Sequence, residues 1–178
     1  MQVNIDAVTV ELLRGDITAQ ADLDAVVNAA NAQLTTGGGV AGAIHRAAGP
    51  ELEAECRPLA PIRPGQAVIT GAGNMPNRHI IHCLGPVHGV DEPSDSLLAN
   101  CYERAIQLAD EHELTGIGFP AISTGAFGYP VRDAAPIAID AAVRAANASR
   151  SVRLVRFVLF SEQDLEVHRE VLANRVGD

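Results

Sequence analysis

The sequence of 178 residues contains no lysine, and all of its 13 basic residues are arginines. Chemistry that needs a lysine, as a Schiff base, a general base or the phosphate ligand of a Walker-type loop, is therefore excluded, since a guanidinium stays protonated and cannot replace it as a nucleophile. The formal net charge is −9, and the arginines form no run. Both facts argue against binding to nucleic acid backbones.

Cysteine is scarce as well. Cys56, Cys83 and Cys101 are odd in number and far apart, so they indicate neither a disulfide framework nor a zinc knuckle. We expect all three to be small, buried core residues.

No stretch approaches the roughly 20 apolar residues of a membrane span, and the N-terminal residues lack the basic start and apolar core of a signal peptide. We therefore expect a cytoplasmic protein. Apolar residues make up 47% of the sequence and charged residues 20%, the balance of a soluble globular protein. The length suits one domain over residues 1–178, and we expect a monomer because no long edge or coiled-coil pattern is present.

Two kinds of short apolar segment alternate along the chain. Runs rich in β-branched residues predict strands at Val8–Leu13, Ala25–Asn28, Ala67–Thr70, His79–Leu84, Gly116–Pro120 and Val152–Phe160. Helical patterns occupy Val40–Ala48, Glu51–Arg57, Ser94–His112, Asp133–Ala148 and Ser161–Asn174. Ser161 followed by Asp164 looks like an N-cap signal for the last helix.

Most of the predicted strands are apolar on both sides of the pleat, which is typical of a sheet covered on both faces. The sequence therefore predicts an α/β fold, a three-layer α/β/α sandwich. Residues 66–70 and 79–84 are joined by a short Gly-Asn-Met-Pro-Asn segment and indicate an antiparallel hairpin. We expect the sheet to be mixed.

Three loops of unusual composition follow predicted strands. They are RGDIT at 14–18, NAANAQLTTGGGV at 28–40 and PAISTGAFGYP at 120–130. Ligands of open α/β sheets bind beyond the carboxyl ends of the strands. We therefore expect the functional site at these loops.

Gly37, Gly39 and Gly42 match the G-x-G-x-x-G dinucleotide fingerprint by accident. Some eight residues separate the predicted strand from Gly37, whereas the fingerprint must follow a strand directly. An anion cradle remains, because glycines allow close approach of the backbone and their N–H groups lead into a helix N-terminus. The segment 123–130 repeats the arrangement, with a helix entered through proline. Two cradles suggest a diphosphate, although either loop alone could be a surface turn.

Four motifs, in order, resemble the macrodomain family: GDIT at 15–18, VVNAAN at 26–31, GGGVAGAIHRAAG at 37–49 and FPAISTGAFGYP at 119–130. The resemblance implies a single domain with a mixed, mostly parallel six-stranded sheet and a cleft for ADP-ribose, without a cofactor or metal. The sequence is most similar to the bacterial hydrolase branch. That branch removes ADP-ribose from acidic side chains of mono-ADP-ribosylated proteins and deacetylates O-acetyl-ADP-ribose.

The resemblance also implies roles for single residues. Asp16 matches the carboxylate that accepts a hydrogen bond from the adenine amino group, although an Asx turn would explain it too. Ile17 follows with a backbone N–H toward the base, and Phe160 matches the aromatic residue that stacks on adenine, a plain core phenylalanine being the alternative. Asn31 matches the asparagine that contacts the distal ribose hydroxyls. Asn28 is a further ligand contact or holds the loop in shape.

The phosphate loops are assigned by the same resemblance. The first loop comprises Gly38, Gly39 and Val40, followed by Ala41. The second comprises Ser123, Thr124, Gly125, Ala126 and Gly128, with Phe127 at the aromatic position that orients the distal ribose. The residues assigned to catalysis are Asn31, Gly39 and Phe127.

Ala41 departs from the family pattern. The bacterial deacetylases most often have an aspartate here, in GGGVDGAIH, which is usually invoked to orient or activate water. Other macrodomains with GGGVAGA, including viral ones, still remove ADP-ribose, and in them the substrate's diphosphate is thought to assist water. We therefore expect a hydrolase slower than its aspartate-bearing relatives. Alternatives are a module that binds ADP-ribose without turnover and a phosphatase acting on ADP-ribose 1″-phosphate.

The remaining candidate groups point to structural roles. His79 and His82 lie three positions apart on a strand, so they face opposite sides and cannot bind one metal ion together. His45 is interpreted as a packed helix residue or a partner behind the site. No pair of carboxylates lies close to the two loops, which argues against a glycosidase-like acid and base.

Overall fold

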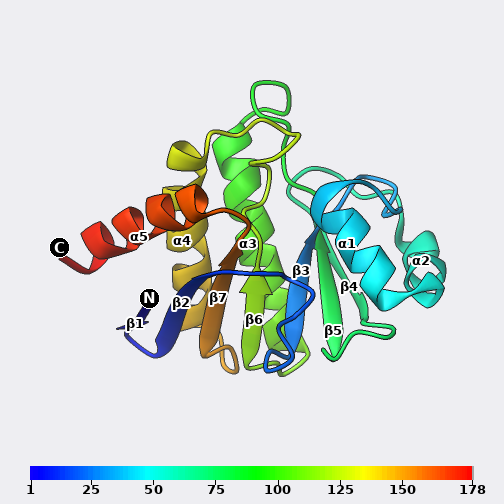
Figure 1. Cartoon of the computed structure of the whole chain (residues 1–178), viewed down its shortest axis with the longest axis horizontal. Helices are drawn as coiled ribbons and strands as arrows, with labels where there is room; N and C mark the ends of the chain where they lie inside the picture. The colour runs from blue at the N-terminus through cyan, green and yellow to red at the C-terminus, as the bar shows by residue number, and fades with distance from the viewer. Residues whose placement is uncertain (178) are drawn as a thin grey trace.

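The computed structural model describes residues 1–177, in which a seven-stranded mixed sheet lies between layers of helices (Figure 1). The strands are β1 Gln2–Ile5, β2 Val8–Arg14, β3 Ala25–Ala29, β4 Ala67–Gly71, β5 His79–Cys83, β6 Gly116–Phe119 and β7 Leu154–Leu159, in the order β1-β2-β7-β6-β3-β5-β4. The helices are α1 Gly39–Ala48, α2 Pro50–Cys56, α3 Ser94–Glu111, α4 Val131–Ala148 and α5 Glu162–Gly177, with a short 3₁₀ turn at Arg57–Leu59. Within these residues no helix combines the length and apolarity needed to cross a bilayer.

Every predicted strand and helix forms, and no end is shifted by more than three residues. The predicted hairpin is confirmed, because β4 and β5 pair antiparallel from Ala67↔Cys83 to Gly71↔His79. The predicted cap of α5 is confirmed as well, since the Asp164 N–H donates to the Ser161 hydroxyl at 3.1 Å. The sandwich is therefore the predicted one.

The expected count of six strands is wrong by one, the extra strand being β1. It pairs antiparallel with β2 from Gln2↔Glu11 to Ile5↔Val8, across a turn in which Asp6 has a φ of +54°. Its four residues alternate between exposed and half-buried and carry no apolar run. Val3 and Ile5 alternate with Gln2 and Asn4, but a period-2 pattern of four residues is at the short limit of a strand signal, and we do not predict a strand from it.

The two faces of the sheet are covered differently. Helices α3, α4 and α5 cover one face, where Tyr102, Phe119 and Phe157 form an aromatic cluster with ring centroids 4.9 to 6.1 Å apart. On the other face α1 and α2 bury Ile44 and Leu52. The loop 15–24 lies on that face beside Val158 of β7, packing Ile17 there. All three cysteines are buried and free, as predicted.

Strands β3 and β6 pair over a short distance only. Their register contains two pairs, Ala25↔Ile117 and Val26↔Gly118, after which β3 pairs with β5 alone and β6 with β7 alone. Beyond this point β3 leads to α1 on one face, and β6 leads to α4 on the other. Such a switch point at the carboxyl ends of parallel strands is where α/β sheets open a crevice for ligands.

A buried polar chain joins β3, β5 and β4 beneath α2. Asn28 Nδ2 donates to His82 Nδ1 at 3.1 Å, which places the single imidazole proton on Nε2. That nitrogen lies 2.9 Å from the Thr70 hydroxyl, which in turn donates to the Gly71 carbonyl at 2.8 Å. Cys56 Sγ lies 3.7 Å from the same nitrogen. A second proton on His82 would sit on Nδ1 and face the Asn28 amide donor, so this arrangement requires a neutral His82.

Burial, and to a smaller extent the nearby His45, lower the pKa of His82 to about 3. The unfolded chain takes up a proton near the ordinary pKa of about 6.5, so the stabilising contribution is complete above that pH. As the pH falls from about 6.5 to 3, we expect this group to lower the free energy of unfolding by up to about 1.4 kcal/mol per pH unit. Urea unfolding between about pH 7 and pH 4 measures the slope.

His82→Asn is the test variant, because its side-chain oxygen can still accept the hydrogen bond from Asn28. Its free energy of unfolding should depend less steeply on pH than that of the wild type. Equal slopes in the two proteins would contradict the account.

Candidate functional site

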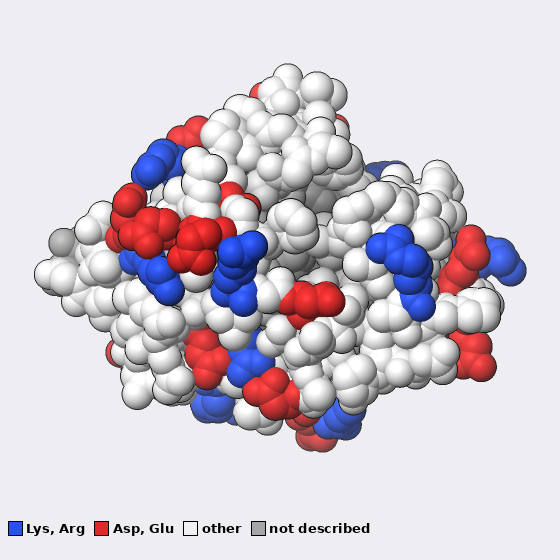
Figure 2. Space-filling view, in the orientation of Figure 1, with Lys and Arg blue, Asp and Glu red and all other residues white. Residues whose placement is uncertain are grey.

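Two adjoining cavities lie at the carboxyl ends of β2, β3, β6 and β7. The outer cavity, of about 730 Å³, extends from the loop after β2 to Phe160. The inner cavity, of about 470 Å³, lies between the loops after β3 and β6. Figure 2 shows the same face hollowed between the loops at the top and the surface over α1. A third hollow, of about 530 Å³ between β4 and α3, contains none of the predicted site residues.

Nearly all of the predicted site residues line these two cavities. The outer cavity contains Asp16, Ile17, Gly39, Val40, Thr124, Gly125 and Phe160. The inner cavity contains Asn31, Gly38, Gly39, Val40, Ala41, Ser123, Gly125, Ala126 and Phe127. The three loops that the sequence singled out therefore meet at one site.

Two predicted ligand contacts, Asn28 and Gly128, lie outside the cavities. Asn28 is buried behind the inner cavity, where its amide holds His82. Gly128 has a φ of +73° and closes the second loop by donating its N–H to the Gly125 carbonyl. Both positions fit residues that shape a loop, because neither lines either cavity.

The first glycine loop ends in an uncapped helix. Gly38 is the N-cap of α1 and offers no side chain, and the first turn contains no acidic residue. Within residues 1–177 the N–H groups of Gly38, Gly39 and Val40 have no hydrogen-bond acceptor. Gly42 is required here because a Cβ would come within 2.5 Å of the Gly37 carbonyl oxygen. These N–H groups and the helix dipole form a site for an anion.

The second loop, after β6, offers a similar set of donors. The N–H groups of Gly125, Ala126 and Phe127 find no acceptor in the described part of the chain. Ser123 has a left-handed backbone with φ +68°, and its buried hydroxyl is without a partner. Gly85 allows this conformation, since a Cβ there would overlap the Ser123 hydroxyl. Buried polar atoms are rarely left unpaired, so these groups are available to a ligand.

The two donor sets face a common position. Gly39, Val40 and Gly125 each line both cavities. An anion at this junction would accept N–H groups from both loops, without a lysine or a metal ion. The outer and the inner cavity thus adjoin at one anion-binding junction.

One of the two oxygens of the Asp16 carboxylate accepts hydrogen bonds within its own loop. Oδ1 accepts hydrogen bonds from the Thr18 N–H at 2.9 Å and the Thr18 hydroxyl at 2.7 Å, and these bonds lower the pKa of Asp16. Oδ2 accepts none from residues 1–177, and the N–H of Ile17 is likewise free. The Asx turn that was the alternative explanation of Asp16 is therefore present, and a carboxylate acceptor and a backbone donor still line the cavity.

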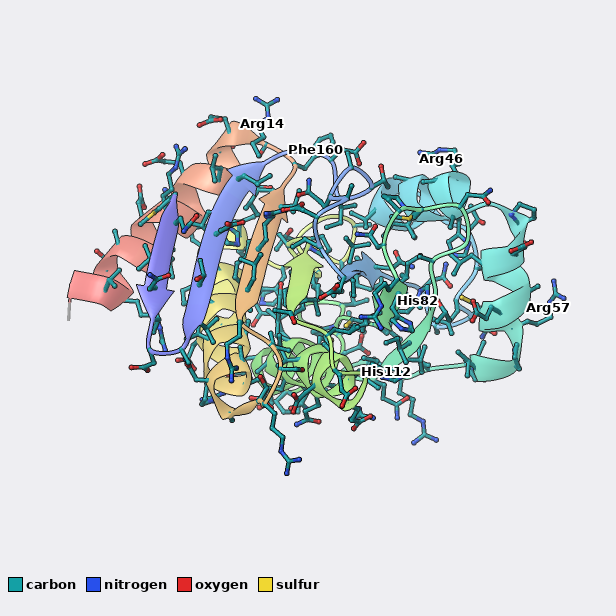
Figure 3. All side chains as sticks on the ribbon, turned by 90° about the horizontal axis from the view of Figure 1, so that it is seen from below. Arg14, Arg46, Arg57, His82, His112 and Phe160 are labelled. Atoms are coloured by element: carbon teal, nitrogen blue, oxygen red, sulfur yellow. The ribbon has the colours of Figure 1, made fainter. Side chains whose placement is uncertain are left out.

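Phe160 is 90% exposed at the end of β7, which rules out the alternative of a core phenylalanine. An exposed ring on the cavity rim is available for stacking. Figure 3 shows Arg14 on the same side as Phe160 and Arg46 on α1 across the site, whereas Arg57 points away. Sequence reasoning missed both rim arginines, although Arg46 lies seven positions after Gly39, on the helix face that lines the outer cavity.

Asn31 is anchored to the loop that it begins. Its Oδ1 accepts the Thr35 N–H at 3.0 Å, and its Nδ2 donates to the Thr35 carbonyl at 2.9 Å. One amide hydrogen remains for a ligand. No residue lining the inner cavity has an ionisable side chain, and Ala41 presents only a methyl group there. A protein side chain in this cavity therefore cannot act as a general base.

The histidines do not form a metal site. His45 is buried, its Nε2 has no partner, and burial lowers its pKa, as suits a residue packed behind the loop. His79 contacts the Thr70 carbonyl and the ring of His112, whereas His82 faces Asn28. Among residues 1–177 no three His, Cys, Asp or Glu side chains are grouped to hold a metal ion.

Comparison with known proteins agrees with the geometry. The Macro domain family matches residues 27–138. A macro domain-containing protein of Chlorobaculum tepidum is 46% identical over 94% of this chain and 98% of its own length. The O-acetyl-ADP-ribose deacetylase of Klebsiella pneumoniae is 44% identical over 94% of this chain and 98% of its own length.

Solved structures show the same relationship. The macrodomain of Oceanobacillus iheyensis with ADP superimposes with a TM-score of 0.95 at 40% identity, covering 99% of this chain and 96% of that one. The macrodomain of Trypanosoma brucei in complex with ADP-ribose has a TM-score of 0.84 at 34% identity, covering 92% of this chain and 68% of that one. By its motifs, its fold and these relatives, the chain belongs to the Macro domain family.

Proposed function

We propose that this macrodomain binds ADP-ribose along its two cavities and hydrolyses carboxylic esters of the distal ribose. Its substrates are O-acetyl-ADP-ribose and mono-ADP-ribosylated acidic side chains of proteins. The observation that carries the proposal is the set of free backbone N–H groups from two loops at the place where the outer cavity, with Phe160 on its rim, meets the inner cavity. Relatives named O-acetyl-ADP-ribose deacetylase and macrodomains solved with ADP and ADP-ribose support it.

The outer cavity suits the adenine base. Asp16 Oδ2 accepts the amino group, the Ile17 N–H donates to the ring, and Phe160 stacks on its face. The diphosphate lies at the junction, where Gly39 and Gly125 donate from opposite loops. This placement directs the distal ribose into the inner cavity.

In the inner cavity the distal ribose contacts Asn31 and Phe127. The remaining amide hydrogen of Asn31 donates to a ribose hydroxyl, while the Phe127 ring packs against the sugar and orients it. Thr124 and Ser123 line the second loop on the two sides of the diphosphate. The ester carbon is then held beside the backbone of the first loop.

Hydrolysis must proceed without a protein base, because the inner cavity lacks one. Water held near Gly39 attacks the ester carbonyl carbon and a substrate phosphate oxygen at the junction accepts its proton; the bond from that carbon to the ribose oxygen then breaks, and the departing oxygen takes up the proton. Free N–H groups of the loops stabilise the negative charge that develops. Both proposed substrates are esters of the distal ribose and give the same products, ADP-ribose and a carboxylic acid.

A reader module that holds ADP-ribose without turnover is the second candidate, and Ala41 is the observation that favours it. The phosphatase alternative has less support, because within residues 1–177 Ser123 is the only hydroxyl side chain that lines the inner cavity and no ionisable side chain lines that cavity to activate it. Incubation with O-acetyl-ADP-ribose and with a glutamate-linked ADP-ribosylated protein, alongside calorimetry with ADP-ribose, separates the candidates. We expect binding together with release of ADP-ribose; binding without release would leave the reader module.

Ala41→Asp tests the base-free mechanism. The new carboxylate would enter the inner cavity from the first turn of α1, where it could accept a proton from water. General base catalysis typically contributes ~10²–10⁴-fold, so we expect turnover of O-acetyl-ADP-ribose to rise by at least about tenfold. Unchanged turnover together with unchanged affinity for ADP-ribose would refute the role given to the missing base.

Asn31→Ala and Asp16→Ala should affect different steps. Loss of Asn31 misplaces the distal ribose, so kcat should fall about 10- to 100-fold with a smaller change in affinity. Loss of Asp16 removes a charged acceptor of the base, so the Kd for ADP-ribose should rise about tenfold. Glu51→Ala, which removes an exposed carboxylate outside both cavities, is the control for charge. Equal effects of Asn31→Ala on kcat and affinity would contradict its assigned role.

A further inference from the structure

Arg156 of β7 is a buried cation whose hydrogen bonds join the sheet to the loop that follows β2. Its Nε donates to Glu11 of β2 at 2.7 Å, and its Nη1 and Nη2 form a bidentate pair with Asp22 at 2.8 and 2.7 Å. Nη1 also donates to Gln20 Oε1 at 3.0 Å. Asp22 and Gln20 belong to the loop 15–24, so this arginine fastens the loop to the sheet.

Gln20 links Arg156 to the turn at residues 16–19, which contains Asp16. Its side chain is buried, and its Nε2 donates to the backbone carbonyl of Asp16 at 2.9 Å. The guanidinium can only donate, so Oε1 must face Arg156 and the NH₂ group must face Asp16. The amide of Gln20 therefore has one orientation, with both of its ends engaged.

The hydrogen bond from Gln20 helps to hold the turn that presents the Asp16 carboxylate. The backbone carbonyl of Asp16 also accepts the Ala19 N–H at 3.0 Å. Because Thr18 is hydrogen-bonded to Oδ1, the carboxylate is fixed to the turn, and the direction in which Oδ2 points depends on how the turn is oriented. The backbone of Gln20 is held separately, because Asn77 Nδ2 donates to its carbonyl at 2.8 Å. Removing the side chain of Gln20 thus takes away one of the two hydrogen bonds to the Asp16 carbonyl, while the N–H of Gly15, bonded to the Leu159 carbonyl at 3.0 Å, keeps the loop attached.

We propose that Gln20, oriented by Arg156, is a positioning residue that aims the Asp16 carboxylate at the adenine amino group and so sets the preference for adenine over purines lacking that group. The inference rests on the proposed placement of ADP-ribose. A merely structural role for Gln20 would change stability without changing this preference.

The test compares two ligands by calorimetry: ADP-ribose and inosine diphosphate ribose, in which a carbonyl oxygen replaces the amino group. The wild type should bind ADP-ribose about 10- to 100-fold more tightly, as expected for a hydrogen bond to a charged acceptor. Gln20→Glu keeps the oxygen that faces Arg156 but places a second oxygen against the Asp16 carbonyl. In this variant the preference should fall to about threefold or less, with the affinity for inosine diphosphate ribose nearly unchanged.

Gln66→Glu is the matched control, because it makes the same change at an exposed glutamine whose Oε1 accepts the Arg63 N–H far from the cavities. It should retain the full preference. Binding of inosine diphosphate ribose shows that each variant is folded, and Gln20→Met, uncharged and of similar length, gives the answer should Gln20→Glu fail to fold.

The outcomes separate the two proposals. A wild type that does not bind ADP-ribose, or that binds both ligands equally, would overturn the adenine placement and this inference with it. A wild type with the preference and folded Gln20 variants that keep it in full would overturn the positioning role alone.

Discussion

The short parallel pairing of β3 with β6 is the constraint on which the site depends. The two strands share two residue pairs and then separate, each continuing with its other neighbour. Because parallel strands carry their outgoing loops at the same end of the sheet, the separation places the loops 30–38 and 120–130 opposite one another. A longer pairing would close the crevice and bury the N–H groups that now face it.

The anion site at this junction is built from backbone rather than from charged side chains. The chain carries a net charge of −9 and no lysine, yet free N–H groups at two loops supply donors for a diphosphate. Figure 2 shows arginine side chains on both sides of the hollow, and Arg14 and Arg46 are those that line the outer cavity. Donors fixed by the backbone need no reorganisation when a ligand enters, which suits hydrolysis that relies on positioning.

Buried polar side chains hold both halves of the site from behind. Asn28 and His82 connect the strand that precedes the first loop to β5, and Arg156 with Gln20 fixes the loop 15–24 over β7. Neither pair contacts the cavities, but each sets the direction of the chain just before a residue that does. Burial lowers the pKa of His82, and the neutral ring accepts the Asn28 amide hydrogen while it donates to the Thr70 hydroxyl.

The sequence by itself determined the order of elements, the mixed sandwich and the three loops that form the site, because periodic apolar runs and clustered glycines are local signals. We do not predict β1 from it, because the alternation of its four residues is too short to stand out, and the strand is defined by its pairing with β2. The tertiary structure alone decided that Phe160 is exposed, that Asn28 faces His82 rather than the cavities, and that Gln20 joins Arg156 to Asp16. These contacts join residues up to 136 positions apart, so they depend on how the sheet brings distant strands and loops together and leave no trace in local spacing.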